Sequence, residues 1–76
     1  MNEFIAYLIK NLVDKPDSVE VKAYDADNDT ILEVRVSPED IAKVVGRQGK
    51  TIKSLRTIVT SVGARFGRRV RLELMN

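Results

Sequence analysis

Two glycines separated by two residues, in Gly46-Arg47-Gln48-Gly49, are the part of this chain best suited to bind a ligand. Glycine has no Cβ, so such a stretch can turn sharply and bring its backbone amides close to another chain. Lys43, Lys50 and Lys53 add positive charge, and a helix begins at the loop, so its free N–H groups face outward there. A phosphate backbone is the natural ligand for such a surface. Taken alone, the spacing also fits an ordinary turn between two helices.

The composition offers little for catalysis or for metal binding. The chain has no cysteine and no histidine, which removes thiolate ligands, the commonest metal ligand and the commonest general base. Gly49-Lys50-Thr51 resembles the end of a nucleotide-binding P-loop, but that motif requires a preceding strand and a glycine where this chain has Val44. We therefore expect no enzyme activity, no cofactor, no metal and no small-molecule substrate.

Three aspartates at alternating positions, Asp25, Asp27 and Asp29, match the opening of a calcium-binding loop. The sixth position of that motif should be glycine and the twelfth glutamate, whereas this chain has Thr30 and Val36. Aspartate and asparagine are also standard turn residues. A solvated hairpin turn is the favoured interpretation of these residues.

Charge is divided unevenly along the 76 residues. Residues 1–40 hold four basic and ten acidic residues, a net charge of −6, whereas residues 41–76 hold nine basic and one acidic, a net charge of +8. Such an asymmetry indicates a polyanion-binding face with an acidic back. Four arginines near the C-terminus either extend that face or are merely solvated: Arg65, Arg68, Arg69 and Arg71.

The N-terminal residues 1–15 carry Glu3 and Lys10 within an apolar stretch and lack a cleavage-site pattern. They favour a soluble helix over a signal peptide. No run approaches the roughly 20 apolar residues of a membrane span. A cytoplasmic protein without membrane contact is the expectation.

Apolar periodicity predicts six elements. Helical spacing predicts an amphipathic helix over residues 4–13 that stops before Pro16, and alternation predicts strands over 19–24 and 32–36 around the acidic turn 25–29. A short helix, a longer helix and a last strand follow, over 37–45, 50–66 and 69–74. We expect an α+β domain in which three helices cover one face of a three-stranded sheet.

Several residues are predicted to begin and end these helices. Ser37 suits the N-cap of the first central helix, Pro38 suits its first turn, and Asp40 suits the position that completes a capping box. Gly67 suits the end of the second central helix.

The segment Val44-Val45-Gly46-Arg47-Gln48-Gly49-Lys50-Thr51-Ile52 resembles the signature of the KH domain, in which apolar pairs flank a GxxG loop. The loop also lies in a strand–helix–helix–strand unit, over residues 30–75, as that motif requires. The helix and strand within residues 1–25 look like the extension of the type II form, which is found in bacteria. The resemblance covers residues 1–76 as a single type II KH domain.

Residues 37–40 and 50–59 are similar to the small single-KH proteins of the KhpA (YlqC) family. That resemblance implies broad RNA binding, as an RNA chaperone or post-transcriptional regulator, by a homodimer or with a larger Jag-type KH protein. It also implies that the loop clamps the backbone of about four nucleotides. Bases would lie in a groove formed by Ile41, Val45 and an edge strand carrying residues 32–36.

The residues expected to bind single-stranded RNA lie in the first central helix, the loop and the start of the second helix: Ile41, Lys43, Val45, Gly46, Arg47, Gln48, Gly49, Lys50 and Lys53. No aromatic residue is near the loop in the sequence, so stacking of bases on aromatic rings is not expected.

A protein–protein interaction module is the alternative function. Phe4, Ile58 and Val62 are apolar residues beyond the main core stripe, and Ile58 and Val62 lie one helical turn apart as candidate dimer contacts. Both could instead complete the core. Self-association and RNA binding are compatible, because joining two weak modules raises their combined affinity.

Overall fold

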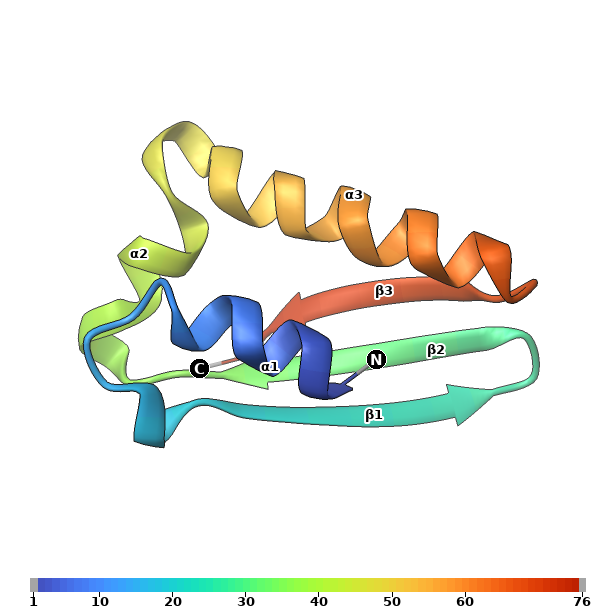
Figure 1. The fold of residues 1–76 in the computed structure, drawn as a ribbon, viewed down its shortest axis with the longest axis horizontal. Helices are drawn as coiled ribbons and strands as arrows, with labels where there is room; N and C mark the ends of the chain where they lie inside the picture. Colours follow the sequence, from blue (N-terminus) through green and yellow to red (C-terminus); the bar gives the residue numbers. More distant parts are fainter. Residues whose placement is uncertain (1, 76) are drawn as a thin grey trace.

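The structure is a computed structural model that describes residues 2–75, and its elements follow the predicted order (Figure 1). They are α1 (Asn2–Lys10), β1 (Glu20–Ala26), β2 (Asp29–Arg35), α2 (Ile41–Val45), α3 (Lys50–Arg65) and β3 (Arg69–Leu74). Single 3₁₀ turns precede β1, α2 and α3, at Pro16–Ser18, Pro38–Asp40 and Arg47–Gly49. The predicted α+β fold of the type II KH domain is confirmed.

Strand β2 lies in the middle of the sheet. It pairs antiparallel with β1 and parallel with β3, so that Leu32 stands opposite both Ala23 and Leu72. The expectation that residues 32–36 belong to an edge strand is therefore wrong, and Leu32, Val34 and Val36 are buried. Parallel neighbours need a crossover connection, and the crossover through α2 and α3 brings β3 beside β2. The free edges of the sheet belong to β1 and β3.

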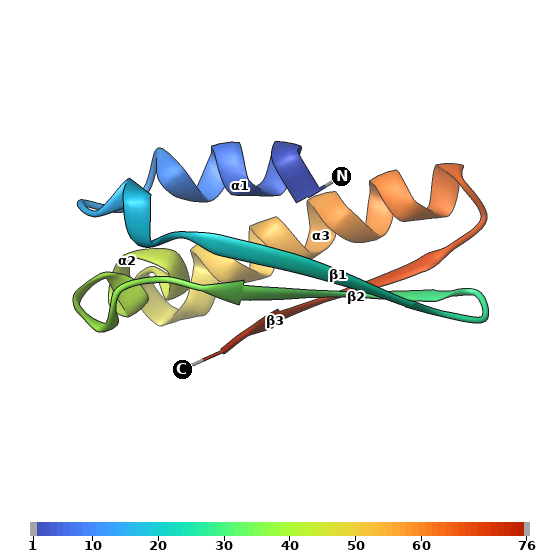
Figure 2. The same cartoon turned by 90° about the horizontal axis from the view of Figure 1, so that it is seen from below.

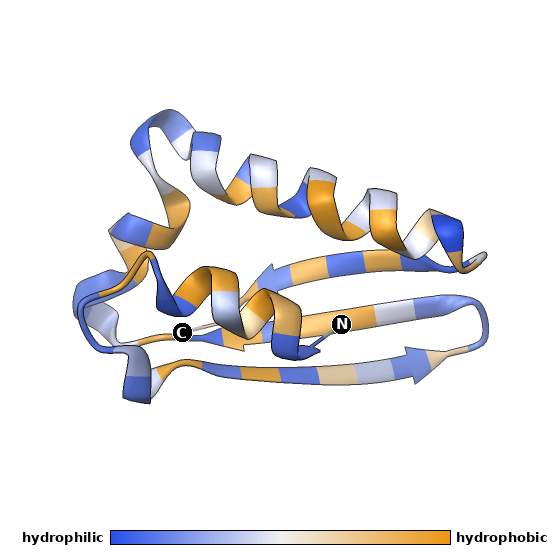
Figure 3. Cartoon of the chain, in the orientation of Figure 1, coloured by the Kyte–Doolittle hydropathy of each residue, from blue (hydrophilic) through white to orange (hydrophobic). Residues whose placement is uncertain are grey.

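The helices lie on one side of the sheet, as expected (Figure 2). Ile5 and Ile9 of α1 are fully buried, and α3 directs its apolar side towards the strands (Figure 3). Alternate residues of β2 point into this core, so Thr30, Leu32 and Val34 are buried, whereas β1 stays almost entirely exposed. The core consists mainly of aliphatic residues: Ile5, Ile9, Leu32, Val34, Val36, Val44, Ile52, Leu55, Val59, Val70 and Leu72.

Helix α1 ends at Lys10, which is earlier than the stop before Pro16 that the apolar pattern predicts. The chain beyond it bends towards the start of α2. There the backbone N–H groups of Asp14 and Lys15 donate hydrogen bonds to the carboxylate of Asp40, at 3.2 and 3.0 Å. The side chain of Asp40 is only 1% exposed. This long-range contact satisfies backbone groups that a longer helix would have satisfied internally.

The predicted capping box is wrong. Neither Ser37 nor Asp40 makes a side-chain capping hydrogen bond, although Pro38 does occupy the first turn. Burial disfavours the charged form of Asp40, but the two amide hydrogen bonds and the nearby charge of Lys43 outweigh it. The pKa of Asp40 therefore lies below its ordinary value.

Helix α3 approaches β3 closely at Gly63. A Cβ atom at this position would lie 2.4 Å from Cγ2 of Val70 and 3.1 Å from the carbonyl oxygen of Arg68. The helix ends just beyond, where the N–H of Arg68 donates to Gly63 O at 3.0 Å and that of Gly67 to Ala64 O at 3.1 Å. This pair of hydrogen bonds is a Schellman motif, and it gives Gly67 the terminating role that the sequence predicts.

Candidate nucleic-acid interface

The loop between α2 and α3 reverses the chain within four residues. The Gly46 N–H donates to Ala42 O at 2.9 Å and ends α2, and the Gly49 N–H donates to Gly46 O at 3.1 Å. Three of the four residues have positive φ: 78° at Gly46, 57° at Gln48 and 74° at Gly49. Only Gln48 among them has a side chain to strain. Positive φ at these positions interrupts the helical path between α2 and α3.

Gly46 is also required because there is no room for a Cβ atom at this position. A Cβ atom there would lie 2.2 Å from Oγ1 and 2.6 Å from Cβ of Thr51, in the first turn of α3. The loop and the start of α3 therefore fit together through this one contact. The sequence signature includes Thr51, but nothing in its residue type signals that it packs on Gly46.

The side chains around the loop are basic and exposed. Arg47, Gln48, Lys50 and Lys53 all face solvent, and within residues 2–75 no ion pair involves Arg47, Lys50 or Lys53. Helix α3 starts at Lys50 without a side-chain cap, although the N–H of Lys50 itself donates to Arg47 O. Uncompensated cations at the positive end of a helix dipole are a combination that binds phosphate.

Lys43 is placed differently from the other lysines of the predicted site. Its ammonium group makes a short ion pair with Asp14 and lies 3.7 Å from Oδ1 of Asp40. The hydrogen bond to Asp14 raises the pKa of Lys43, against the opposing effect of desolvation. Its charge is thus partly compensated within the chain, and it contributes less to a polyanion-binding surface than Lys50 or Lys53.

Ile41 and Val45 of α2 are half-buried and pack against the core. Their neighbour Val44 is fully buried and anchors this short helix. The exposed parts of Ile41 and Val45 give the area beside the loop an apolar character.

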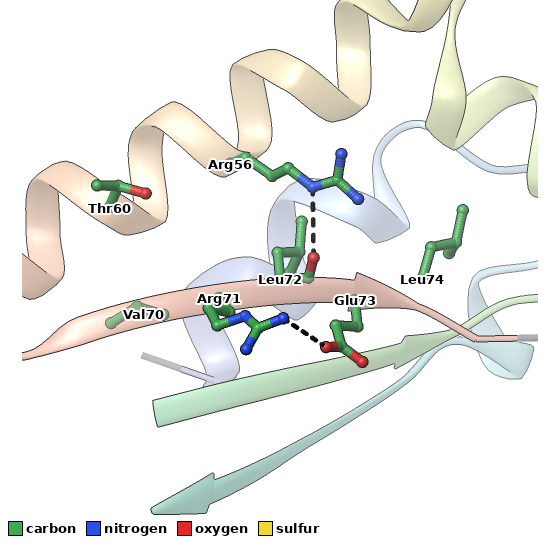
Figure 4. Close-up of a pocket in the computed structure, with 7 residues that line it drawn as sticks. All are labelled: Arg56, Thr60, Val70, Arg71, Leu72, Glu73 and Leu74. Carbon is green, nitrogen blue, oxygen red and sulfur yellow. Dashed lines mark hydrogen bonds and ion pairs between the residues drawn. The ribbon is translucent and has the colours of Figure 1, made fainter. Parts of the chain in front are cut away.

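A groove of about 530 Å³ runs between α3 and the free edge of β3 (Figure 4). Its lining residues come from these two elements alone: Arg56, Thr60, Val70, Arg71, Leu72, Glu73 and Leu74. The side chain of Arg56 reaches across, and its Nε donates to the carbonyl oxygen of Leu72 at 3.4 Å. Sequence reasoning missed this groove, because it exists only where β3 becomes an edge strand next to α3.

A model of the KH domain of KhpA and KhpB matches residues 2–74 of the chain. The chain belongs to the KhpA/KhpB family of KH domains. Among its relatives, the RNA-binding protein KhpA of Chlamydia trachomatis serovar D is 47% identical over 75 residues, which cover 99% of this chain and 96% of that protein. The RNA-binding protein KhpA of Streptomyces coelicolor is 42% identical over 76 residues, which cover 100% and 92%. The predicted resemblance to the KhpA family is confirmed.

A solved structure has the same arrangement of elements. The crystal structure of a variant of Aquifex aeolicus Era, bound to GDP and AlF4⁻, matches with a TM-score of 0.63 at 22% sequence identity. The match covers 96% of this KH domain and 28% of the Era chain. At 22% sequence identity, this match shows that the two chains share a fold.

Two of the four C-terminal arginines of this KH domain hold the fold together. Arg68 donates from Nε to Thr30 Oγ1 at 2.8 Å and from Nη2 to Asp25 Oδ1 at 3.2 Å and Asp29 O at 2.8 Å. Arg69 donates to the carboxylate of Asp29 at 2.9 Å. Arg68 and Arg69 are thus engaged within the chain, a role that neither predicted alternative, an extended binding face or mere solvation, included. They also place cations beside Asp25 and Asp29, two of the three aspartates of the acidic turn.

The two predicted dimer residues differ in exposure. Ile58 is 37% exposed, whereas Val62 is half-buried and lines a second groove, mainly apolar, of about 470 Å³ between α1, α3 and the sheet. Phe4 and Phe66 flank this groove and are 48% and 75% exposed. The KH domain therefore carries an apolar surface on the helix side, distinct from the groove beside β3. None of the helices within residues 2–75 is long and apolar enough to cross a membrane.

Proposed function

We propose that this protein binds single-stranded RNA through the loop Gly46–Gly49 and the groove between α3 and β3. The observation that carries the proposal is the loop itself, an exposed turn with positive φ at three residues and uncompensated basic side chains. Membership of a family whose relatives are named RNA-binding proteins supports it. The proposed activity is binding without catalysis, in the cytoplasm.

In the proposed complex the sugar-phosphate backbone lies against the loop. Arg47, Lys50 and Lys53 neutralise phosphate charge, while backbone amides at the start of α3 donate hydrogen bonds to phosphate oxygens. Gln48 stands at the tip, where its amide can bond to a phosphate or a ribose hydroxyl. Lys43 lies at the margin of this contact because Asp14 and Asp40 already hold it.

The bases enter the groove between α3 and β3, and the half-buried Ile41 and Val45 of α2 offer further apolar contact next to the loop. None of the seven lining residues is aromatic, so the stacking that gives strong sequence-tolerant affinity is absent from this groove. A single domain of this kind covers about four nucleotides. Weak binding to many RNAs suits an RNA chaperone or a post-transcriptional regulator.

A double substitution in the loop tests the phosphate contact. We expect Arg47→Asp with Gln48→Asp to reduce RNA affinity at least about tenfold, because two negative charges would stand where phosphate lies. Both side chains are exposed, so the free energy of unfolding should change by only about 0.5 kcal/mol per site. Fluorescence anisotropy with a short single-stranded RNA and thermal melting of the same samples measure the two quantities.

The matched control makes the same change of net charge at two exposed residues of the β1–β2 hairpin, Lys22→Asp with Asn28→Asp, and should leave RNA affinity unchanged. Unchanged affinity of the loop variant with an unchanged melting temperature would show that the loop is not the phosphate site.

The apolar surface around Phe4, Ile58, Val62 and Phe66 supports a second proposal, that the protein self-associates or pairs with a larger Jag-type KH protein. Phe4, Val62 and Phe66 line one groove, and a contiguous exposed apolar patch marks an interaction site where scattered apolar residues would not. Joining two domains makes the second RNA contact intramolecular and raises affinity without new chemistry.

Ile58→Asp tests the self-association. A charge one helical turn from Val62 should convert dimers to monomers and weaken RNA binding by about tenfold or more. Light scattering over a concentration series measures the mass. Ser61→Asp adds the same charge to an exposed position of the same helix and should leave the mass unchanged. A native protein that remains monomeric at high micromolar concentration would contradict the proposal.

A further inference from the structure

Arg56 is the one charged side chain that reaches across the groove between α3 and β3. Its Nε donates to Leu72 O at 3.4 Å, which is a long hydrogen bond, and its two terminal nitrogens extend into the groove (Figure 4). Within residues 2–75 no carboxylate forms an ion pair with it. The guanidinium group therefore retains two parallel donors for a ligand.

The edge of β3 supplies the opposite kind of group. The N–H groups of Arg69 and Met75 donate to Asn28 O and Val34 O, so alternate residues of β3 direct their polar groups towards β2. Leu72 is one of the intervening residues, whose backbone polar groups point away from β2. Its carbonyl oxygen faces the groove and accepts the hydrogen bond from Arg56. A carbonyl oxygen has two lone pairs and can accept a second hydrogen bond.

The carbonyl oxygen of Leu72 and the two terminal nitrogens of Arg56 form a row of one acceptor and two donors. Arg56 lies six residues after Lys50, about 9 Å along the helix axis. A nucleotide whose phosphate contacts the loop can therefore place its base at this row. Val70 and Leu74 lie beside it and offer apolar contact to the base ring.

We infer that Arg56 and the Leu72 carbonyl together select cytosine, an inference that rests on the proposed RNA binding. The Watson–Crick edge of cytosine presents a donor, its N4 amino group, followed by two acceptors, N3 and O2. The amino group donates to Leu72 O, and the two terminal nitrogens of Arg56 donate to N3 and O2. Arg56 is thus a specificity-determining residue.

The other bases fit this row less well. Uracil presents acceptor, donor and acceptor, so its O4 faces the Leu72 carbonyl and its N3–H faces the guanidinium group. Adenine satisfies the carbonyl and one donor and leaves the second donor without a partner. The Watson–Crick edge of guanine presents two donors and one acceptor, which leaves a donor facing Arg56. Each mismatch leaves polar groups unpaired in the groove and lowers affinity.

Binding of RNA hexamers made only of cytidine, uridine or adenosine tests the inference. At one salt concentration, we expect the native protein to bind the cytidine hexamer about tenfold more tightly than the uridine hexamer, as for a good bidentate contact. Arg56→Lys keeps the charge but loses the paired donors, and it should reduce this ratio below about threefold. Arg56 is exposed and lysine forms helices well, so the variant should fold.

Arg65→Lys is the matched control, because Arg65 is exposed on the same helix away from this groove, and its cytidine preference should equal that of the native protein. Equal binding of all three hexamers, or a preference that survives Arg56→Lys, would overturn the inference while leaving RNA binding intact. Equal weakening of all three hexamers by Arg56→Lys would mark Arg56 as a phosphate contact and also overturn it. Failure of the native protein to bind any hexamer would overturn the proposed function itself.

Discussion

Gly46 and Gly49 occupy the two ends of the loop but impose different demands. Gly46 has φ 78° and ψ 174°, a region that glycine alone occupies readily, and its missing Cβ makes room for Thr51. Gly49 has φ 74° and ψ 14°, the left-handed helical region, and nothing lies within 4 Å of the position where a Cβ would stand. The first glycine is therefore required by both backbone and packing, the second by backbone alone.

The two glycines give a matched pair of substitutions. We expect Gly49→Ala to lower the free energy of unfolding by about 1–2 kcal/mol, the usual cost of the left-handed conformation. Gly46→Ala should cost about 3 kcal/mol or more, because overlap with Thr51 adds to the strain. Urea titration of both variants measures the difference. Equal losses would mean that Thr51 moves aside and that packing does not constrain the loop.

At the scale of elements, Asp40 joins three parts of the chain. Its carboxylate binds the segment after α1, through the amides of Asp14 and Lys15, and lies close to Lys43 in α2. Helix α2 has only five residues and could not persist without such contacts. Since α2 leads directly into the loop, Asp40 helps to hold the loop in place.

This arrangement predicts a pH dependence. The pKa of Asp40 is lower in the folded chain than its ordinary value of about 3.9, so its contribution to stability is present above about pH 4 and is lost as the pH falls through the folded value. We expect Asp40→Asn to be less stable than the native protein at pH 7 and to lose less stability between pH 4 and pH 2. Circular dichroism melts at several pH values measure this.

Glu39→Gln is the control, because Glu39 is exposed and pairs only with Lys15 at the surface. It should keep the acid sensitivity of the native protein. If Asp40→Asn and the native protein lose stability in parallel below pH 4, other carboxylates determine the acid transition.

At the scale of the whole molecule, the fold partly neutralises the charge asymmetry of the sequence. Lys43, Arg68 and Arg69 of the basic half pair with aspartates of the acidic half. Among the described residues 41–75, the basic residues without an ion pair all lie on the loop and α3: Arg47, Lys50, Lys53, Arg56 and Arg65. Lys10, Lys22 and Arg35 also lack an ion pair, but they are dispersed over α1, β1 and β2. A positive ridge along one helix therefore remains for a polyanion.

The salt dependence of RNA affinity tests whether this positive ridge binds phosphate. Log affinity for single-stranded RNA should fall linearly with log salt concentration, with a slope of about −2 to −3 for three or four neutralised phosphates. Lys50→Ala or Lys53→Ala should flatten the slope by about 0.7. Arg69→Ala removes a cation that Asp29 already pairs, so its slope should stay unchanged. A flat profile of the native protein would favour the protein–protein interaction module instead.

Local patterns determined most of the elements and the loop. Apolar spacing in α3 and alternation in β2 reflect the 3.6-residue and two-residue periods of helix and strand, which depend only on near neighbours. The loop Gly46–Gly49 could be predicted from the sequence because a sharp turn between two helices needs glycine within a few residues. The type II KH order followed from these elements and from the resemblance to the KhpA family, and the family comparison confirmed it.

Only the tertiary structure decided which strand lies at the edge and which charges are paired. β3 is parallel to β2, and no residue near β3 in the sequence signals its neighbour, so the groove with Arg56 could not be foreseen. Arg68 contacts Asp25 and Asp40 contacts Lys15 across 43 and 25 residues of sequence. Such contacts arise when the core closes, because burial of Leu32 between Ala23 and Leu72 sets the register that brings distant polar groups together.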